Sequence, residues 1–257
     1  MTQKGFDLLK EKVPEFRSPL KAGGIVIMGF LIFLGIMLFF WWVDNLVSYG
    51  VLISQGIVAV ISSAFSYSFV KNVEKYRNLY GSKAYRYYFF HFVVPLLVTG
   101  NACLFHPLIV KGTGLLPFLL GVVLGMFFIF VRFLLEWHIR MSGFDEIGHG
   151  LGIYMIFPEE GTRINTGIYT YIRHPMHAGD FCLALGFALL RNNVLALLAA
   201  FISFIPFIVE TKLEDTELVK RFGEEHRVYI GETGAFFPHK NIGKLLRLLF
   251  SVDREQY

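Results

Sequence analysis

A cluster of polar, aromatic and basic residues lies directly before an apolar run in the second half of the chain. It reads Gly167-Ile-Tyr-Thr-Tyr-Ile-Arg-His-Pro-Met-His-Ala-Gly-Asp180, and almost all of residues 181–190 after it are apolar. Ionisable side chains at the edge of a membrane segment are costly, which suggests that they are retained for function. Pro175 can occupy the first turn of a helix, where free backbone N–H groups bind anions. The stretch therefore predicts the floor of a binding site.

Three side chains of this stretch also permit a metal site. His174, His177 and Asp180 follow one another at intervals of three residues, and His226 could add a further ligand. If the helix begins at Pro175, however, His174 lies outside it and does not share its face with His177. We therefore favour a site without metal. Asp180 then either forms a hydrogen bond within the bundle or orients His177.

The composition is that of a membrane protein. Of the 257 residues, 54% are hydrophobic and only 17% are charged. A transmembrane helix takes about 20 apolar residues, so about six spans fit into the chain. Both cysteines fall in apolar runs, which argues against a disulfide framework. We predict an all-α polytopic helix bundle with spans at about residues 23–43, 51–70, 85–110, 114–137, 176–190 and 194–209.

Basic residues predict the orientation of these spans. Five Lys and Arg residues precede the first span, five lie between the second and third, three lie in the long connection after the fourth, and eight follow residue 210. By the positive-inside rule, these segments and both termini face the cytoplasm, in a bacterial inner membrane or in the endoplasmic reticulum. Because topology accounts for the basic residues, we expect no nucleic-acid partner.

After the last span the chain becomes acidic. Glu210, Glu214 and Asp215 lie on a predicted helix that Gly223 should end, since glycine readily adopts the left-handed conformation at a helix C-terminus. Residues 242–250 combine apolar with basic side chains, which predicts a helix lying in the membrane surface. The acidic helix and the polar stretch before the fifth span are thus expected on the same side of the membrane.

Two other segments are less informative. Residues 148–152 read Gly-His-Gly-Leu-Gly, which fits neither a dinucleotide fingerprint nor a P-loop and therefore favours a flexible loop. Residues 1–23 are charged and weakly amphipathic, and they permit either an interfacial helix or a solvated lead-in.

Several features occur together in a characteristic order. They are Gly-x-Tyr-x-Tyr-x-Arg-His-Pro-Met-x-x-Gly at residues 167–179, the acidic pair Glu214 and Asp215, Leu218, Phe222-Gly-Glu-Glu225, Tyr229 and Pro238. This set resembles the isoprenylcysteine carboxyl methyltransferase and phospholipid methyltransferase superfamily of integral membrane enzymes. The resemblance covers about residues 155–240. His177 and His226 depart from it, because the family commonly has tyrosine at both positions.

The resemblance implies S-adenosylmethionine as the cofactor, held between the cytoplasmic ends of the last two spans and the C-terminal segment. This cofactor carries a sulfonium, an ammonium, a carboxylate and an adenine, so it needs carboxylates, basic or N–H groups, and an aromatic surface. We expect it to be bound by Tyr171, Arg173, His174, Pro175, Gly179, Glu210, Glu214, His226, Tyr229, Phe237 and Pro238.

The expected organisation is a single membrane domain. It comprises transmembrane helices over residues 1–153, a cofactor-binding core over 154–240 and an interfacial helix over 241–257. The expected partners are membrane lipids and a lipid-like or amphiphilic methyl acceptor.

The expected activity is methylation of that acceptor, with His177, Glu214 and Arg173 as candidate catalytic residues. If the acceptor is an amine, His177 could take up its proton near neutral pH. Alternatively, His177 lines the pocket in place of tyrosine. Other functions are an NADPH-dependent membrane reductase of the sterol reductase type and a non-catalytic membrane protein with the same fold. NADPH would need basic residues for its extra phosphate, whereas acidic residues suit a cationic cofactor.

Overall fold

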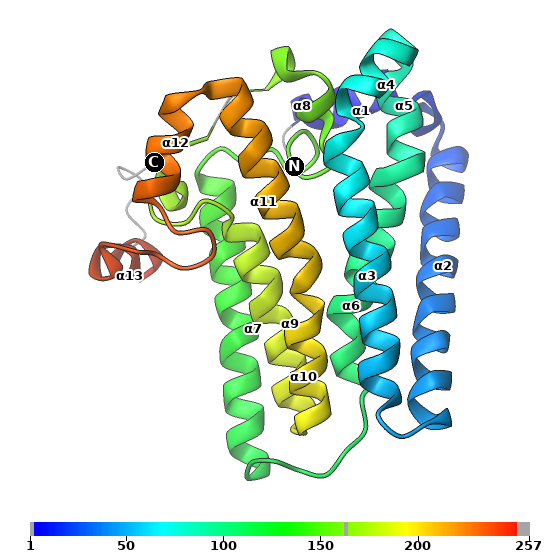
Figure 1. Cartoon of the computed structure of the whole chain (residues 1–257), viewed down its shortest axis with the longest axis vertical. Helices are drawn as coiled ribbons and strands as arrows, with labels where there is room; N and C mark the ends of the chain where they lie inside the picture. Colours follow the sequence, from blue (N-terminus) through cyan, green and yellow to red (C-terminus); the bar gives the residue numbers. More distant parts are fainter. Residues whose placement is uncertain (1–2, 162–163, 251–257) are drawn as a thin grey trace.

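The computed structural model describes residues 3–161 and 164–250, and 81% of these residues are helical (Figure 1). The α-helices are α1 (Gln3–Lys12), α2 (Pro19–Leu46), α3 (Gly50–Lys71), α4 (Val73–Tyr80), α5 (Ala84–Tyr88), α6 (Val94–Ile109), α7 (Phe118–Met141), α8 (Ile153–Ile156), α9 (Pro175–Arg191), α10 (Val194–Ser203), α11 (Ile205–Phe222), α12 (Glu224–Glu232) and α13 (Ile242–Phe250). Short 3-10 turns cover Pro14–Arg17, Gly81–Lys83, Pro158–Glu160 and Gly167–Thr170, and a π-helical turn covers Phe89–Val93.

The predicted class, an all-α polytopic membrane bundle, is confirmed. Among the described residues, five helical stretches are long and apolar enough to cross a membrane, namely Pro19–Leu46, Gly50–Lys71, Val73–Ile109, Phe118–Met141 and Val194–Phe222. The remaining expected span, the fifth at residues 176–190, corresponds to α9, whose 17 residues are at the lower end of the length that spans a bilayer. In the bilayer such helices satisfy their own backbone hydrogen bonds, which is why an apolar run folds this way.

Local sequence signals set the ends of the helices around the site. Pro175 occupies the first turn of α9. Asn192 ends α9 in the left-handed conformation, and the side chain of Asn193 caps α10 by accepting a hydrogen bond from the Ala196 N–H at 2.9 Å. Gly223 ends α11 with a φ of 62°, as predicted. The hairpin between α9 and α10 therefore lies where the sequence predicts it.

The bundle is held together by a few extensive contacts between helices. Helix α7 packs along α9, α11 packs along α3, and α6 contacts α2, α3, α9 and α10. A Cβ atom on Gly125 of α7 would lie 2.9 Å from the carbonyl oxygen of Gly186 on α9. Small residues thus let these two backbones approach closely, as is common between membrane helices.

The two amphipathic terminal helices both pack on the rest of the protein. Leu8, Leu9 and Val13, in and just after α1, are buried in one apolar cluster with residues of α3, α5 and α8. Leu245 and Leu248 of α13 are buried against α7 and the segment before α9. The first segment is therefore a packed helix rather than a solvated lead-in.

The ends of the bundle differ in the segments they carry. Helices α1, α4, α8 and α12 lie at one end, and the connections α2–α3, α6–α7 and α9–α10 lie at the other (Figure 1). At that second end the Leu115 N–H donates to the carbonyl oxygen of Asn192 at 2.8 Å. Each of the four basic segments therefore has a described helix at the first end, the one that we expect to face the cytoplasm.

Cysteine labelling tests this orientation. Thr113, in the α6–α7 connection, and Glu232, at the end of α12, are both exposed. A membrane-impermeant maleimide should label Thr113→Cys only from the periplasmic or luminal side and Glu232→Cys only from the cytoplasmic side. The unsubstituted chain, with its own Cys103 and Cys182, gives the background. Labelling of both variants from one side would contradict the arrangement of spans.

Candidate functional site

A cavity of about 410 Å³ is lined in part by α4 and α12, two of the helices at the first end of the bundle. Its wall is formed by α3 and α4, by the connection between α7 and α9, by the start of α9, and by α11 and α12. The volume lies within the usual range for small-molecule sites in proteins.

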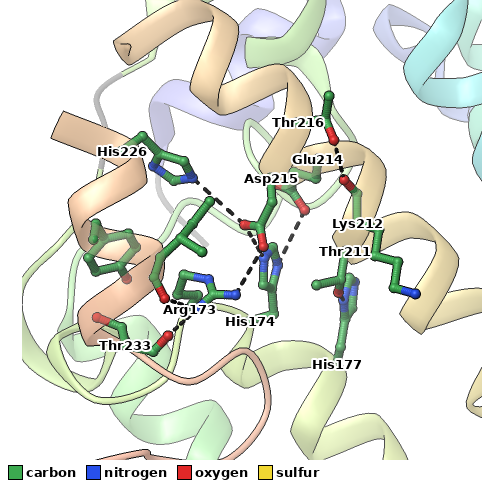
Figure 2. Close-up of polar contacts among 12 residues, drawn as sticks. Arg173, His174, His177, Thr211, Lys212, Glu214, Asp215, Thr216, His226 and Thr233 are labelled. Carbon is green, nitrogen blue, oxygen red and sulfur yellow. Dashed lines mark hydrogen bonds and ion pairs between the residues drawn. The ribbon is translucent and has the colours of Figure 1, made fainter. Parts of the chain in front are cut away.

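Asp215 of α11 is the centre of a charged network in this cavity (Figure 2). Its Oδ2 accepts a hydrogen bond from Nη2 of Arg173 at 3.1 Å, and its Oδ1 accepts one from Nε2 of His174 at 3.0 Å. Nε2 of His226 lies 3.7 Å from the same Oδ1. His174 also faces the next carboxylate, with Nδ1 3.4 Å from Oε2 of Glu214. One helix thus holds two basic side chains that come from the opposite wall.

The C-terminal segment fixes the backbone that carries those basic side chains. The Arg173 N–H donates to the carbonyl oxygen of Gly234, and the His174 N–H donates to that of Ala235, both at 2.9 Å. The Arg173 guanidinium also donates to the carbonyl oxygens of Ile230, at 3.0 Å, and Thr233. Arg173 therefore joins α11, α12 and the start of α9, and its geometry suits a positioning role.

The charged network keeps His174 protonated. Burial by itself would lower the pKa of His174, but the hydrogen bonds and negative charges of Asp215 and Glu214 outweigh this effect and raise it to about 9. At neutral pH the network therefore contains two cations, Arg173 and His174, and the carboxylates that hold them.

His177 and Asp180 have separate partners. Nδ1 of His177 lies 3.0 Å from Oγ1 of Thr211 on α11, and its ring lies parallel to that of His174 with centroids 5.6 Å apart. Asp180 instead forms an ion pair of 3.1 Å with Nε of Arg132 on α7. Asp180 therefore does not orient His177, because the two side chains point to different helices. The side chains of His174, His177 and Asp180 therefore do not converge on one point.

A second carboxylate faces the cavity one turn before Glu214. Glu210 accepts a hydrogen bond from Oγ of Ser66 on α3 at 3.3 Å. The sequence did not predict a role for Ser66 in the site, because Ser66 lies in a span that was identified from its hydropathy alone. On the other side of the site, the Tyr229 hydroxyl donates to the carbonyl oxygen of Tyr169 at 2.6 Å.

The structure brings most of the predicted site residues together. Eight of them line the cavity, namely Arg173, His174, Pro175, His177, Glu210, Glu214, His226 and Tyr229. The other four, Tyr171, Gly179, Phe237 and Pro238, lie outside its lining.

Two of those four have a clear reason for their position. A Cβ atom on Gly179 would lie 2.8 Å from Cδ of Arg132, so this glycine serves the packing of α9 on α7. Phe237 is 63% exposed, whereas its neighbour Phe236 points inward and packs edge-on against Phe204 with centroids 4.7 Å apart.

Sequence reasoning missed most of the wall formed by the first half of the chain. Phe69, Val70, Val73, Glu74 and Arg77 of α3 and α4 all line the cavity. So do residues of the connection between α7 and α9, including two from the glycine-rich segment 148–152. That segment is packed rather than loosely looped, since a Cβ atom on Gly152 would lie 2.5 Å from the ring of Phe69.

The chain is similar to a known protein family over part of its length. Residues 120–225 match the family model described as phospholipid methyltransferase. Over these residues the chain is similar to a phospholipid methyltransferase domain. Comparisons with curated proteins and with solved structures gave no match.

The phospholipid methyltransferase domain contains the central contacts of the site. Arg173, His174, His177, Glu210 and Asp215 all fall within residues 120–225. The matched segment also contains the long apolar helices α7 and α10–α11, and the five apolar helices make the chain an integral membrane protein. The resemblance drawn from the sequence motifs is thereby confirmed at the level of the family.

Proposed function

We propose that the protein transfers a methyl group from S-adenosylmethionine to a lipid-like or amphiphilic acceptor at the cytoplasmic end of the bundle. The observation that carries this proposal is the charge of the cavity. Three carboxyl groups of α11, those of Glu210, Glu214 and Asp215, line the cavity together with two basic groups from the start of α9, those of Arg173 and His174. When all five are ionised, one negative charge remains for a cation.

The residues present fit S-adenosylmethionine, which supplies an electrophilic methyl group when bound. Glu214 and Glu210 would hold its positive charges, because both carboxylates line the cavity and neither pairs with Arg173. The first-turn N–H groups of α9, at Met176 and His177, have no acceptor one turn earlier in the helix and would hold its carboxylate. Asp215 and Arg173 would keep these elements in place.

The opposite wall supports an amphiphilic acceptor. Phe69, Val70 and Val73 give α3 and α4 an apolar surface in the cavity, and Glu74 and Arg77 follow on the next turns of α4. An acceptor with an apolar body and a polar end would match an apolar surface that is followed by charged side chains. His177, which also lines the cavity, would take up a proton if the methylated group is an amine.

Titration with two cofactors tests the function directly. Calorimetry of the purified protein in detergent should show binding of S-adenosylmethionine and none of NADPH, because NADPH brings an additional phosphate to a site with excess carboxylate. Binding of NADPH alone would overturn the proposal and favour a reductase.

Glu214→Gln should weaken binding of S-adenosylmethionine by about 1–3 kcal/mol, the scale of a hydrogen bond to a charged group. S-Adenosylhomocysteine, whose sulfur is neutral, should lose less affinity if the carboxylate faces the sulfonium. Dissociation constants of both ligands measure the difference, and Glu224→Gln at the exposed start of α12 is a matched control. Unchanged affinity for S-adenosylmethionine would remove Glu214 from the site.

A further inference from the structure

Four rings from the connection between α7 and α9 line the same cavity. They belong to Phe144, His149, Tyr154 and Tyr169, and we refer to them as the aromatic wall. No step of the proposed methyl transfer requires them. The wall adjoins the charged part of the site, since Tyr169 accepts the hydrogen bond from Tyr229 through its backbone.

The rings of the aromatic wall form an ordered row. Phe144 lies nearly parallel to His149, with centroids 5.1 Å apart and an angle of 26° between the planes. It is also nearly parallel to Tyr169, at 6.3 Å and 17°. Tyr154 meets His149 edge-on at 4.7 Å. Such offset and edge-on arrangements are the preferred geometries of aromatic rings.

Contacts from several neighbouring residues hold this row of rings in place. The Tyr154 hydroxyl donates to Oδ2 of Asp145 at 2.7 Å. A Cβ atom on Gly148 would lie 2.2 Å from the Tyr154 ring, and one on Gly161 would lie 2.5 Å from it, so both positions require glycine. Helix α1 supports the wall from behind, because Gly5 packs directly on Asp145. The wall is therefore fixed before any ligand binds.

We propose that the aromatic wall binds the adenine ring of S-adenosylmethionine, a proposal that rests on the proposed function. The charged network accounts for the sulfonium, the ammonium and the carboxylate of the cofactor, but it offers no surface for a flat heteroaromatic ring. Stacking on aromatic side chains holds such rings without further charge. Phe237, the aromatic residue that the motif suggests, is exposed and lies outside the cavity lining.

Two ligands that both contain the adenosine part of the cofactor, one with and one without its amino-acid part, test this assignment. Phe144→Leu keeps an apolar side chain but removes one ring face of the wall. Calorimetry should show that this substitution lowers the affinity for S-adenosylhomocysteine and the affinity for 5′-methylthioadenosine by the same factor, about tenfold. His149→Leu should act in the same direction and serves as the second variant if Phe144→Leu does not fold. The matched control is Tyr87→Leu, which removes a ring stacked on Tyr80 outside the cavity.

The outcomes separate this assignment from the proposed function. Equal losses for the two ligands, with Tyr87→Leu unchanged, support an adenine site. Unchanged affinities for both ligands, together with a higher KM for the acceptor, would overturn the adenine assignment and indicate that the aromatic wall binds the acceptor. If the unsubstituted protein binds neither S-adenosylhomocysteine nor S-adenosylmethionine, the proposed function and this assignment both fall.

Discussion

Replacing Asp215 with asparagine should destabilise the protein by about 3 kcal/mol, the lower end of the range for breaking a buried ion pair. The side chains of Asp215 and Arg173 are 14% and 9% exposed, and His174 loses the same partner. For a protein of this size the apparent melting temperature in detergent should fall by about 6–12 °C. Glu224→Gln, which disturbs only an exposed pair, should change it by about 2 °C or less.

The pH dependence of the melting temperature shows whether His174 is involved. The pKa of His174 is raised from its ordinary value of 6.5 to about 9, so its stabilising charge is fully present below about pH 6.5 and is lost as the pH rises through about 9. The unsubstituted protein should therefore lose stability between pH 7 and pH 10. Asp215→Asn should lose less over this interval. Parallel curves for the two proteins would show that the pair does not set the pKa of His174.

Replacing His177 with phenylalanine should lower turnover on an amine acceptor by about 10²-fold or more, the usual contribution of a general base. Phenylalanine keeps a ring beside His174 and Phe207, whose centroids lie 5.6 and 5.2 Å from that of His177, but it removes the nitrogen atoms. Affinity for S-adenosylmethionine should stay nearly intact. Single-turnover kinetics and calorimetry of the same preparation measure the two quantities separately.

Two further variants make this result specific. His177→Tyr restores the residue that the family commonly has and should fill the pocket while altering the preference among acceptors. Thr211→Val removes the hydroxyl group that contacts Nδ1 of His177 and should have a smaller effect than loss of the ring nitrogens. Should His177→Phe instead abolish cofactor binding with no separate effect on turnover, His177 is part of the cofactor wall and not a base.

Much of the fold could be predicted because its signals are local. Hydropathy marks the long spans, Pro175 marks the start of α9, and Gly223 marks the end of α11. The acidic residues of α11 could be placed in the site from the order of motifs alone. These features depend on a few neighbouring residues, so one sequence is sufficient to find them.

The remaining wall of the site depends on contacts that carry no local signal. Ser66 meets Glu210 across 144 positions of the chain, and nothing in an apolar span distinguishes that serine from its neighbours. Phe236 and Phe237 are adjacent in an irregular segment, where no periodicity tells which ring points inward. Asp180 and His177 are three residues apart on one helix, yet they contact different neighbouring helices. Asp180 pairs with a residue of α7, and His177 contacts a residue of α11.

The hydrogen bonds around the cavity join parts of the chain that are made at very different times during synthesis. Lys4 donates to the carbonyl oxygen of Glu160 across 156 positions, and Arg173 reaches Thr233 across 60. Closing such long loops is slow compared with forming a helix, so a bundle of spans precedes a complete cavity. Residues 120–225 by themselves would lack Ser66, Arg77 and Tyr229. The hydrogen bonds that hold the backbone of Arg173 and His174 therefore cannot form until residues up to about 235 have been synthesised.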